Sequence, residues 1–268
     1  MLRAACAVWT DRTVGASVSA VAFDKHSRAL LTRHDLGRFA GVTLFDRVAR
    51  VVARAECLPR KELFESWEVA RRVRRRMRGG RVVELAAGHG LVAWLLLLLD
   101  ASSERGLAID ASEPPSAGTL SDAITAEWPR LRDRMERRTE RLEQVALEPN
   151  DLVVSVHACG ALTDRVLSLA IAARARVAVL PCCHDAATCD AGGLLGFLSL
   201  PLAVDATRVA RLRATGLDVH TQTIPAEITP HNRLILATPP GGLMQKHPET
   251  MSREPDHPRP RRAVAPEA

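Results

Sequence analysis

Two kinds of hydrophobic pattern alternate along the middle of this chain. Short, almost continuous apolar runs bounded by glycine, proline or charged residues are typical of buried strands. Longer segments with an apolar residue at every third or fourth position predict helices. Because the two kinds alternate, the pattern predicts a mostly parallel sheet covered by helices. The predicted strands are 81–85, 105–110, a weaker one within 136–145, 151–156, 175–180, 217–224 and 232–238, and the predicted helices are 89–100, 119–135 with an interruption at Pro129, 162–173 and 203–215.

Two more helices are predicted ahead of the first strand. Apolar residues recur at helical spacing from Leu36 to Ala55. Pro59 ends that helix and opens the next, which runs to Gly79-Gly80. Near the C-terminus the chain is rich in proline and charge, which indicates disorder. The expected organisation is a partly helical N-terminal extension at 1–57, an α/β domain at 58–238 and a disordered tail at 239–268.

The first predicted strand of the sheet runs into a turn of small residues. Glu84 lies near the end of the strand, and Ala86, Gly88 and Gly90 follow before an apolar helix. Small residues let the backbone approach a ligand, and the helix N-terminus offers free N–H groups. Twenty residues past Gly90 the second strand ends in Asp110, whose carboxylate can accept hydrogen bonds from both hydroxyls of a ribose. The pattern predicts a site for a cofactor that contains adenosine.

Two such cofactors compete, a dinucleotide and S-adenosylmethionine. A dinucleotide site usually has Gly-x-Gly-x-x-Gly around the pyrophosphate, whereas here Ala93 stands at the last glycine position. The carboxylate of Glu84 would repel a pyrophosphate and suits the cationic methionine end of S-adenosylmethionine. The turn resembles motif I of class I methyltransferases, acid-x-Gly-x-Gly-x-Gly, with Ala86 in place of the first glycine. S-adenosylmethionine is therefore the predicted cofactor, lined by Glu84, Ala86, Gly88, Gly90 and Asp110.

Two further predicted strands end in turns that carry sulfur and imidazole groups. The fourth strand leads into residues 157–164 and the fifth into residues 181–185. Ligands of a doubly wound sheet bind outside the carboxyl ends of its strands, so both turns should lie at the edge marked by Gly88 and Asp110. We therefore expect the methyl acceptor to be lined by His157, Cys159, Asp164, Cys182, Cys183 and His184.

The paired turns, His-x-Cys-Gly-x-x-x-Asp and Pro-Cys-Cys-His, resemble those of one group of class I methyltransferases. Its members include the tRNA acceptor-stem ribose 2′-O-methyltransferase and the methyltransferase-like domain of the protein named for a glutathione S-transferase C-terminal domain. The resemblance covers residues 60–238, without the additional Cys/His zinc modules of the tRNA enzyme. It implies a Rossmann-like class I methyltransferase fold, α/β, with a mostly parallel seven-stranded sheet that ends in an antiparallel hairpin. It implies methyl transfer from S-adenosylmethionine and leaves the acceptor open.

Four chemical roles for these turns stay open. His157 or His184 could act as a general base, or positioning alone could suffice because the sulfonium is already a strong electrophile. Cys159 together with Cys182 or Cys183 resembles the two-cysteine layout of RNA 5-methylcytosine enzymes, in which one thiolate attacks the base. The same cysteines and histidines could bind zinc, but adjacent cysteines chelate one ion poorly and Cys-x-x-Cys is missing, so no metal is predicted. If each of these cysteines and histidines is considered by itself, the alternative is a purely structural role in packing.

Composition and charge indicate where the protein is located, and they say less about which molecule is the methyl acceptor. The chain has 268 residues, a net charge of +6 and six cysteines without the spacing of a disulfide scaffold. No apolar stretch is long enough to cross a bilayer, so we predict a cytoplasmic protein. The positive charge permits RNA as a partner, and the arginines of residues 71–78 form either a nucleic-acid patch or a solvated face. The predicted acceptor is a hydroxyl or nitrogen of a tRNA-like RNA. The alternatives are a small-molecule acceptor, a non-catalytic methyltransferase-like interaction protein, and a metal or redox protein.

Overall fold

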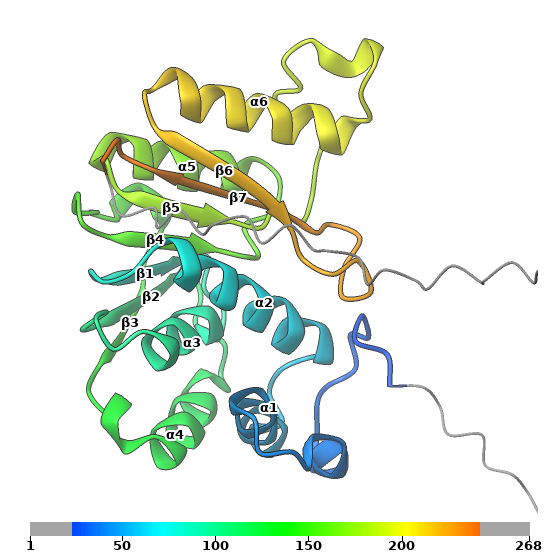
Figure 1. The fold of residues 1–268 in the computed structure, drawn as a ribbon, viewed down its shortest axis with the longest axis vertical. Coiled ribbons are helices and arrows are strands. Elements are labelled where there is room, and N and C mark those ends of the chain that lie inside the picture. The colour runs from blue at the N-terminus through cyan, green and yellow to red at the C-terminus, as the bar shows by residue number, and fades with distance from the viewer. Residues whose placement is uncertain (1–22, 242–268) are drawn as a thin grey trace, which may run out of the picture.

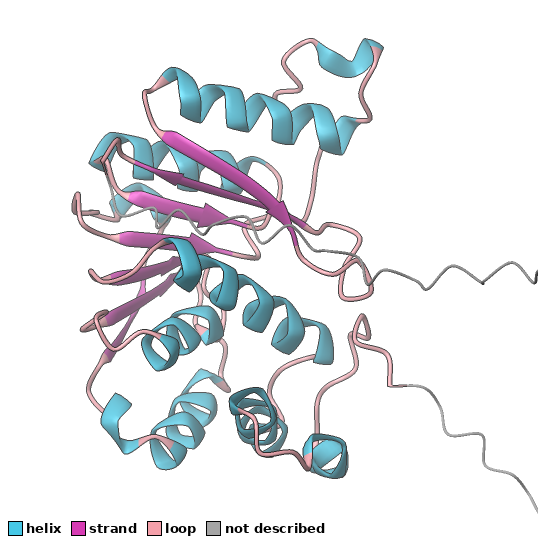
Figure 2. Cartoon of the chain, viewed as in Figure 1, coloured by secondary structure: helices cyan, strands magenta, loops and turns pink. Residues whose placement is uncertain are grey.

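Seven strands pair into one sheet in this computed structural model, which describes residues 23–241 of the chain (Figures 1 and 2). The strand order is β3-β2-β1-β4-β5-β7-β6. Strands β1 to β5 run parallel, and β7 is antiparallel to both of its neighbours. The predicted sheet and its closing antiparallel pair are therefore confirmed. The strands are β1 (Val82–Leu85), β2 (Gly106–Asp110), β3 (Met135–Thr139), β4 (Leu152–Ser155), β5 (Arg176–Val179), β6 (Asp218–Thr223) and β7 (Arg233–Thr238).

Helices cover both faces of the sheet and make three layers. In Figure 1, α5 and α6 lie above the sheet, and α1 to α4 lie below it. Short 3-10 helices at Arg33–Phe39, Pro129–Leu131, Leu142–Gln144 and Leu194–Gly196 complete the described elements. The α-helices are α1 (Leu44–Ala55), α2 (Arg60–Arg76), α3 (Leu91–Leu99), α4 (Ala117–Glu127), α5 (Ala161–Ala173) and α6 (Leu200–Ala214).

The central strands are buried on both faces, which explains their continuous apolar sequences. Every residue of β1 and of β4 is buried. Val82 and Val154 point into the layer that contains α1 to α4, whereas Val83 and Val153 point into the layer that contains α5 and α6. Two hydrophobic cores thus hold the strands in place, and the turns at their carboxyl ends are free to carry polar groups.

Two predicted helices differ from the observed ones at their ends. The segment predicted as one helix from Leu36 to Ala55 is a 3-10 helix followed by α1. The break occurs because Thr43 caps α1, accepting a hydrogen bond from the backbone N–H of Asp46. The helix predicted at 119–135 ends as α4 at Glu127, since Pro129 cannot continue it, and the short 3-10 helix Pro129–Leu131 leads on to β3 at Met135.

The described part of the N-terminal extension packs against α2 through aromatic side chains. Phe39 contacts Phe23 and Phe45 edge-on, and Phe45 also lies against Phe64 and Trp67. Residues 1–22 and 242–268 lie outside the described part, and with them most of the predicted disordered tail. Within residues 23–241, none of the helices is both long and apolar enough to span a membrane.

Candidate functional site

The turn between β1 and α3 adopts a backbone that glycine favours. Ala86, Gly88 and Gly90 have positive φ angles of 52°, 50° and 75°. A Cβ atom built on Gly90 would lie 2.9 Å from Arg137 Nη1 and 3.1 Å from Ala108 Cβ, so a side chain there would clash. A Cβ on Gly88 would meet nothing within 4 Å, so the space above this residue is open to a ligand. The turn therefore fits the cradle expected of a cofactor site.

Asp110 ends β2 directly beside this turn. One carboxylate oxygen accepts a hydrogen bond of 2.8 Å from the N–H of Gly88, and the other accepts one of 3.2 Å from the N–H of Ser112. A carboxylate offers about four lone-pair sites, so two remain for ribose hydroxyls. Asp110 thus fixes the shape of the turn and keeps lone pairs free to accept further hydrogen bonds at the surface of the turn.

Glu84 is placed below the turn rather than at its surface. Its side chain is buried, and Oε2 accepts a hydrogen bond of 2.7 Å from the backbone N–H of Ala93 in the first turn of α3. Burial raises the pKa of Glu84 to about 8, and Arg137 and the helix N–H groups oppose this shift. The carboxyl is therefore largely neutral at pH 7 in the free protein. The negative charge on Glu84 that was expected to face the cationic methionine end of S-adenosylmethionine would develop only when a cation lies beside it.

Arg137 on β3 holds the same turn from the other side, and the sequence did not single it out. Its guanidinium donates hydrogen bonds to the carbonyls of Gly88 and His89 at 2.6 and 3.1 Å and to Glu113 Oε1 at 2.7 Å. His89 Nε2 lies 2.8 Å from Ser116 Oγ. The segment after β2 is thereby tied to the cofactor turn at two points. In the structure Arg137 is half-buried between exposed neighbours, but the polar sequence of β3 carries no signal that separates it from Arg138.

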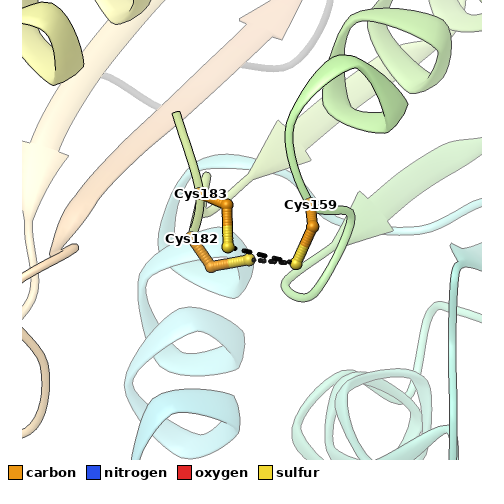
Figure 3. Close-up of side chains that lie close together, drawn as sticks. All are labelled: Cys159, Cys182 and Cys183. Atoms are coloured by element: carbon orange, nitrogen blue, oxygen red, sulfur yellow. Dashed lines mark hydrogen bonds between the residues drawn. The ribbon is translucent and has the colours of Figure 1, made fainter. Parts of the chain in front are cut away.

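The turns after β4 and β5 bring three cysteines together (Figure 3). Cys159 Sγ lies 3.0 Å from Cys182 Sγ and 3.3 Å from Cys183 Sγ. Burial raises the pKa of the Cys159 and Cys182 thiols, and the neighbouring sulfur groups raise that of Cys182 further. Gly160 has φ 55° and ψ −130°, a conformation that needs glycine, and lets the chain turn sharply from Cys159 into α5. The predicted meeting of the two turns at one edge is therefore observed.

Charged residues at the start of α2 lie against these turns. Burial raises the pKa of Glu62, whereas the charge of the nearby His157 lowers it. Lys61 lies close enough to Cys159 to lower the pKa of its thiol, and forms an ion pair of 3.2 Å with Glu65. His157 is an exposed residue, so its imidazole is accessible to an acceptor. Helix α2 therefore forms one wall of the site, which the sequence did not indicate.

His184 and Asp164, both expected to line the acceptor, are engaged in an ionic network in which His184 is buried and the Asp164 side chain is 26% exposed. The His184 side chain is 1% exposed, and its Nε2 lies 2.8 Å from Asp205 Oδ1. Asp164 accepts two hydrogen bonds from Arg208, whose side chain is 2% exposed. Asp205 also accepts from Arg233 at 2.6 Å. The network joins α5, α6, β7 and the turn after β5, and its contacts position the two cysteine-bearing turns from behind.

The arginines of α2 mostly make contacts within the protein. Arg71 and Arg72 both pair with Glu68, and Arg74 donates a hydrogen bond of 2.9 Å to the carbonyl of Leu99. Of the six arginines at 71–78, Arg75 is the exposed one. Three of these arginines are thus paired within the protein, two of them along α2 itself.

Comparison with known proteins points to the same class. Residues 62–190, a little under half of the chain, match a family model described as a methyltransferase domain. Among curated proteins, none matches this chain. The sheet order and the motif I turn are those of the class I methyltransferase fold, and the family match implies S-adenosylmethionine as the cofactor, in agreement with the sequence.

Solved structures with a similar fold are distant in sequence. An O-methyltransferase family protein from Burkholderia thailandensis has 17% identity and a TM-score of 0.42, over 77% of this chain and 67% of its own. Mitomycin 7-O-methyltransferase has 18% identity and a TM-score of 0.45, over 72% of this chain and 56% of its own. Magnesium protoporphyrin IX methyltransferase from Synechocystis PCC 6803, with bound SAH, has 14% identity and a TM-score of 0.42, over 77% of this chain and 93% of its own. At such values the likeness concerns the fold alone.

Proposed function

We propose that this protein is an S-adenosylmethionine-dependent methyltransferase whose acceptor binds beside the turns after β4 and β5. The observation that supports this proposal most is that the cofactor-site residues and the acceptor-side residues lie at the same edge of the sheet. The glycine turn after β1, Asp110 at the end of β2, and the His157 and Cys159 turn after β4 all follow parallel, adjacent strands. Cofactor and acceptor groups would therefore meet where β1 and β4 end.

The cofactor would be held by backbone and carboxylate groups. When bound, S-adenosylmethionine supplies an electrophilic methyl group on a sulfonium. The open backbone at Gly88 would lie under it, and the free lone pairs of Asp110 would accept the ribose hydroxyls. Glu140, the first residue after β3, lies beside Asp110 through a backbone hydrogen bond of 2.9 Å and is our candidate for contact with the adenine. The sequence did not indicate Glu140 because the bounds of this strand were uncertain.

On the acceptor side, the exposed His157 is the candidate general base. An imidazole can take a proton from a hydroxyl or nitrogen near neutral pH, and the neighbouring Glu62 would stabilise the imidazolium that forms. Asp164 and His184 would act as positioning residues through their contacts with Arg208 and Asp205. The Cys159, Cys182 and Cys183 side chains would line the same space.

RNA, in particular tRNA, is our first acceptor class, supported by the resemblance of the paired turns and by the net charge of +6. A small-molecule acceptor is the second candidate. It is favoured by the internal pairing of Arg71, Arg72 and Arg74 on α2, which leaves these side chains less available to phosphates.

Calorimetric titration of the full chain with S-adenosylmethionine and S-adenosylhomocysteine tests the cofactor. We expect saturable binding of both, and a loss of at least about tenfold in affinity for Asp110→Asn, because hydrogen bonds to a charged group are worth about 1.5–3 kcal/mol. Asp218→Asn is the matched control, since Asp218 is an exposed acid on β6. If the folded protein binds neither compound, the proposed function is wrong.

Transfer of labelled methyl groups identifies the acceptor. Purified protein and methyl-tritiated S-adenosylmethionine would be incubated with total RNA, with the same RNA after ribonuclease digestion, and with a small-molecule extract. Label in intact RNA that digestion abolishes supports the RNA proposal, and label in the extract supports the second candidate. Cofactor binding without transfer to either fraction would favour a non-catalytic interaction protein.

A further inference from the structure

Three sulfur atoms converge at the carboxyl edge of β4 and β5. The Sγ atoms of Cys159, Cys182 and Cys183 all lie within 4.8 Å of one another. Figure 3 shows the two adjacent cysteines directed at Cys159, which comes from a different turn. Cys159 and Cys183 are exposed, and Cys182 is partly exposed. Unligated cysteines are usually buried, so a group of three at the surface is unlike ordinary core packing.

The two turns are held together by polar contacts with a single helix. Arg208 of α6 donates a hydrogen bond of 3.0 Å to the carbonyl of Gly160, the residue after Cys159. One turn earlier on α6, Asp205 binds His184, the residue after Cys183. Both α6 side chains are buried. The positions of the sulfurs are thus fixed by a supporting shell, as ligands of protein-bound metals commonly are.

We propose that Cys159, Cys182 and Cys183 bind one zinc ion through three thiolates. Two sulfurs on a tetrahedral zinc lie about 3.8 Å apart, given Zn–S bonds of about 2.3 Å. The observed separations of 3.0 and 3.3 Å need to widen by less than about 1 Å. The sequence predicts no metal, because adjacent cysteines chelate one ion poorly, but in the structure the sulfurs of Cys182 and Cys183 both lie within 4.8 Å of Cys159 Sγ and of each other.

Charge balance at this site is compatible with a tris-thiolate zinc. Binding would convert three thiols into thiolates and release three protons, which leaves a net charge of −1 on the ion and its ligands. Lys61 lies close enough to Cys159 to act on its charge and would offset part of this excess. Three protein ligands leave the fourth position of zinc for water or another small ligand, as in catalytic rather than structural zinc sites.

Metal titration tests this proposal without any assay of methyl transfer. Tag-free full-length protein, reduced with a phosphine and freed of metal, would be titrated with Zn²⁺ against a chromophoric chelator and separately with Co²⁺. We expect one equivalent of each ion, release of protons on binding, and the strong near-ultraviolet absorption of cobalt thiolates. Binding of less than half an equivalent, or cobalt spectra without thiolate absorption, would overturn it.

Serine variants assign the ligands. Cys159→Ser, Cys182→Ser and Cys183→Ser should each weaken zinc binding by more than about tenfold. Cys57→Ser serves as the control because Cys57 is buried and lies outside the cluster. Equal weakening by this control, or unchanged affinity in the cluster variants, would contradict the assignment. The wild-type titration decides the question even if a variant fails to fold, and zinc binding can fail while cofactor binding succeeds.

Discussion

Arg208 of α6 binds the carboxylate of Asp164 on α5 through two hydrogen bonds, of 3.0 Å from Nε and 2.7 Å from Nη2. The same guanidinium donates to the carbonyl of Gly160 and lies 3.2 Å from Asp205. A charged side chain that is 2% exposed requires such partners. The pair therefore anchors the start of α5, and with it the turn that carries His157 and Cys159.

Loss of this anchor should destabilise the protein strongly. Arg208→Met keeps most of the side-chain volume but leaves the carboxylates of Asp164 and Asp205 without their buried partner. We expect a loss of about 3–5 kcal/mol in the free energy of unfolding, measured by urea denaturation. Arg213→Met, at an exposed position of the same helix, should change it by less than about 0.5 kcal/mol. Similar effects of the two substitutions would refute the anchoring role.

Burial of Glu84 should make the stability of the protein depend on pH. Its folded-state pKa of about 8 lies above the ordinary value of 4.5, so the folded state binds the extra proton. Stability from this group is present below pH 4.5 and is lost as pH rises through 8. Glu84→Gln cannot ionise, so between pH 5 and 8 it should gain on the order of 3 kcal/mol relative to wild type in urea denaturation. A constant difference between the two proteins across this range would contradict the raised pKa.

Ala86 occupies the position at which motif I usually has its first glycine, and its φ angle is 52°. A left-handed conformation costs an L-residue about 1–2 kcal/mol, and glycine avoids that cost. Since glycine also loses more chain entropy on folding, Ala86→Gly should stabilise the protein by about 0.5–1 kcal/mol in thermal or urea unfolding. Ala87→Gly, where φ is not positive, should instead destabilise it. A loss of stability in Ala86→Gly would mean that the methyl group has a packing role.

Arg137 should affect cofactor affinity because its planar guanidinium bridges two carbonyls of the cofactor turn. Arg137→Lys keeps the charge but cannot make both bonds in the same geometry. We expect the calorimetric affinity for S-adenosylhomocysteine to fall about tenfold, equivalent to about 1.4 kcal/mol. The neighbouring Arg138→Lys is a matched control, because Arg138 is exposed and pairs with Glu136. Equal affinities for the two variants would show that the clamp is not needed for binding.

Much of the fold could be predicted because the hydrophobic pattern determines it directly. The apolar runs that contain Val83 and Val153 are buried on both faces, and continuous apolar sequence is a strong signal for such strands. The edge strand β3 gave a weak signal, since most of its residues are polar and exposed. Tertiary context, in the form of pairing with β2, decides its structure.

The site was predictable only as far as strand order determines it. Cys159 and Cys182 lie 23 residues apart and meet because β4 and β5 are adjacent and parallel. The burial of His184 depends on Asp205 of α6, a helix whose sequence gives no indication that two of its charged residues face inward. Long-range ionic contacts of this kind leave no local pattern, so the sequence placed His184 and Asp164 among the acceptor-lining residues.

A crystal structure of the protein with S-adenosylhomocysteine tests the central claim most directly. The account predicts the ribose hydroxyls within hydrogen-bonding distance of Asp110, the backbone of Gly88 beneath the ligand, and the ligand sulfur facing the turn that carries His157. Binding at another edge of the sheet, or a ligand whose sulfur faces away from this turn, would contradict it.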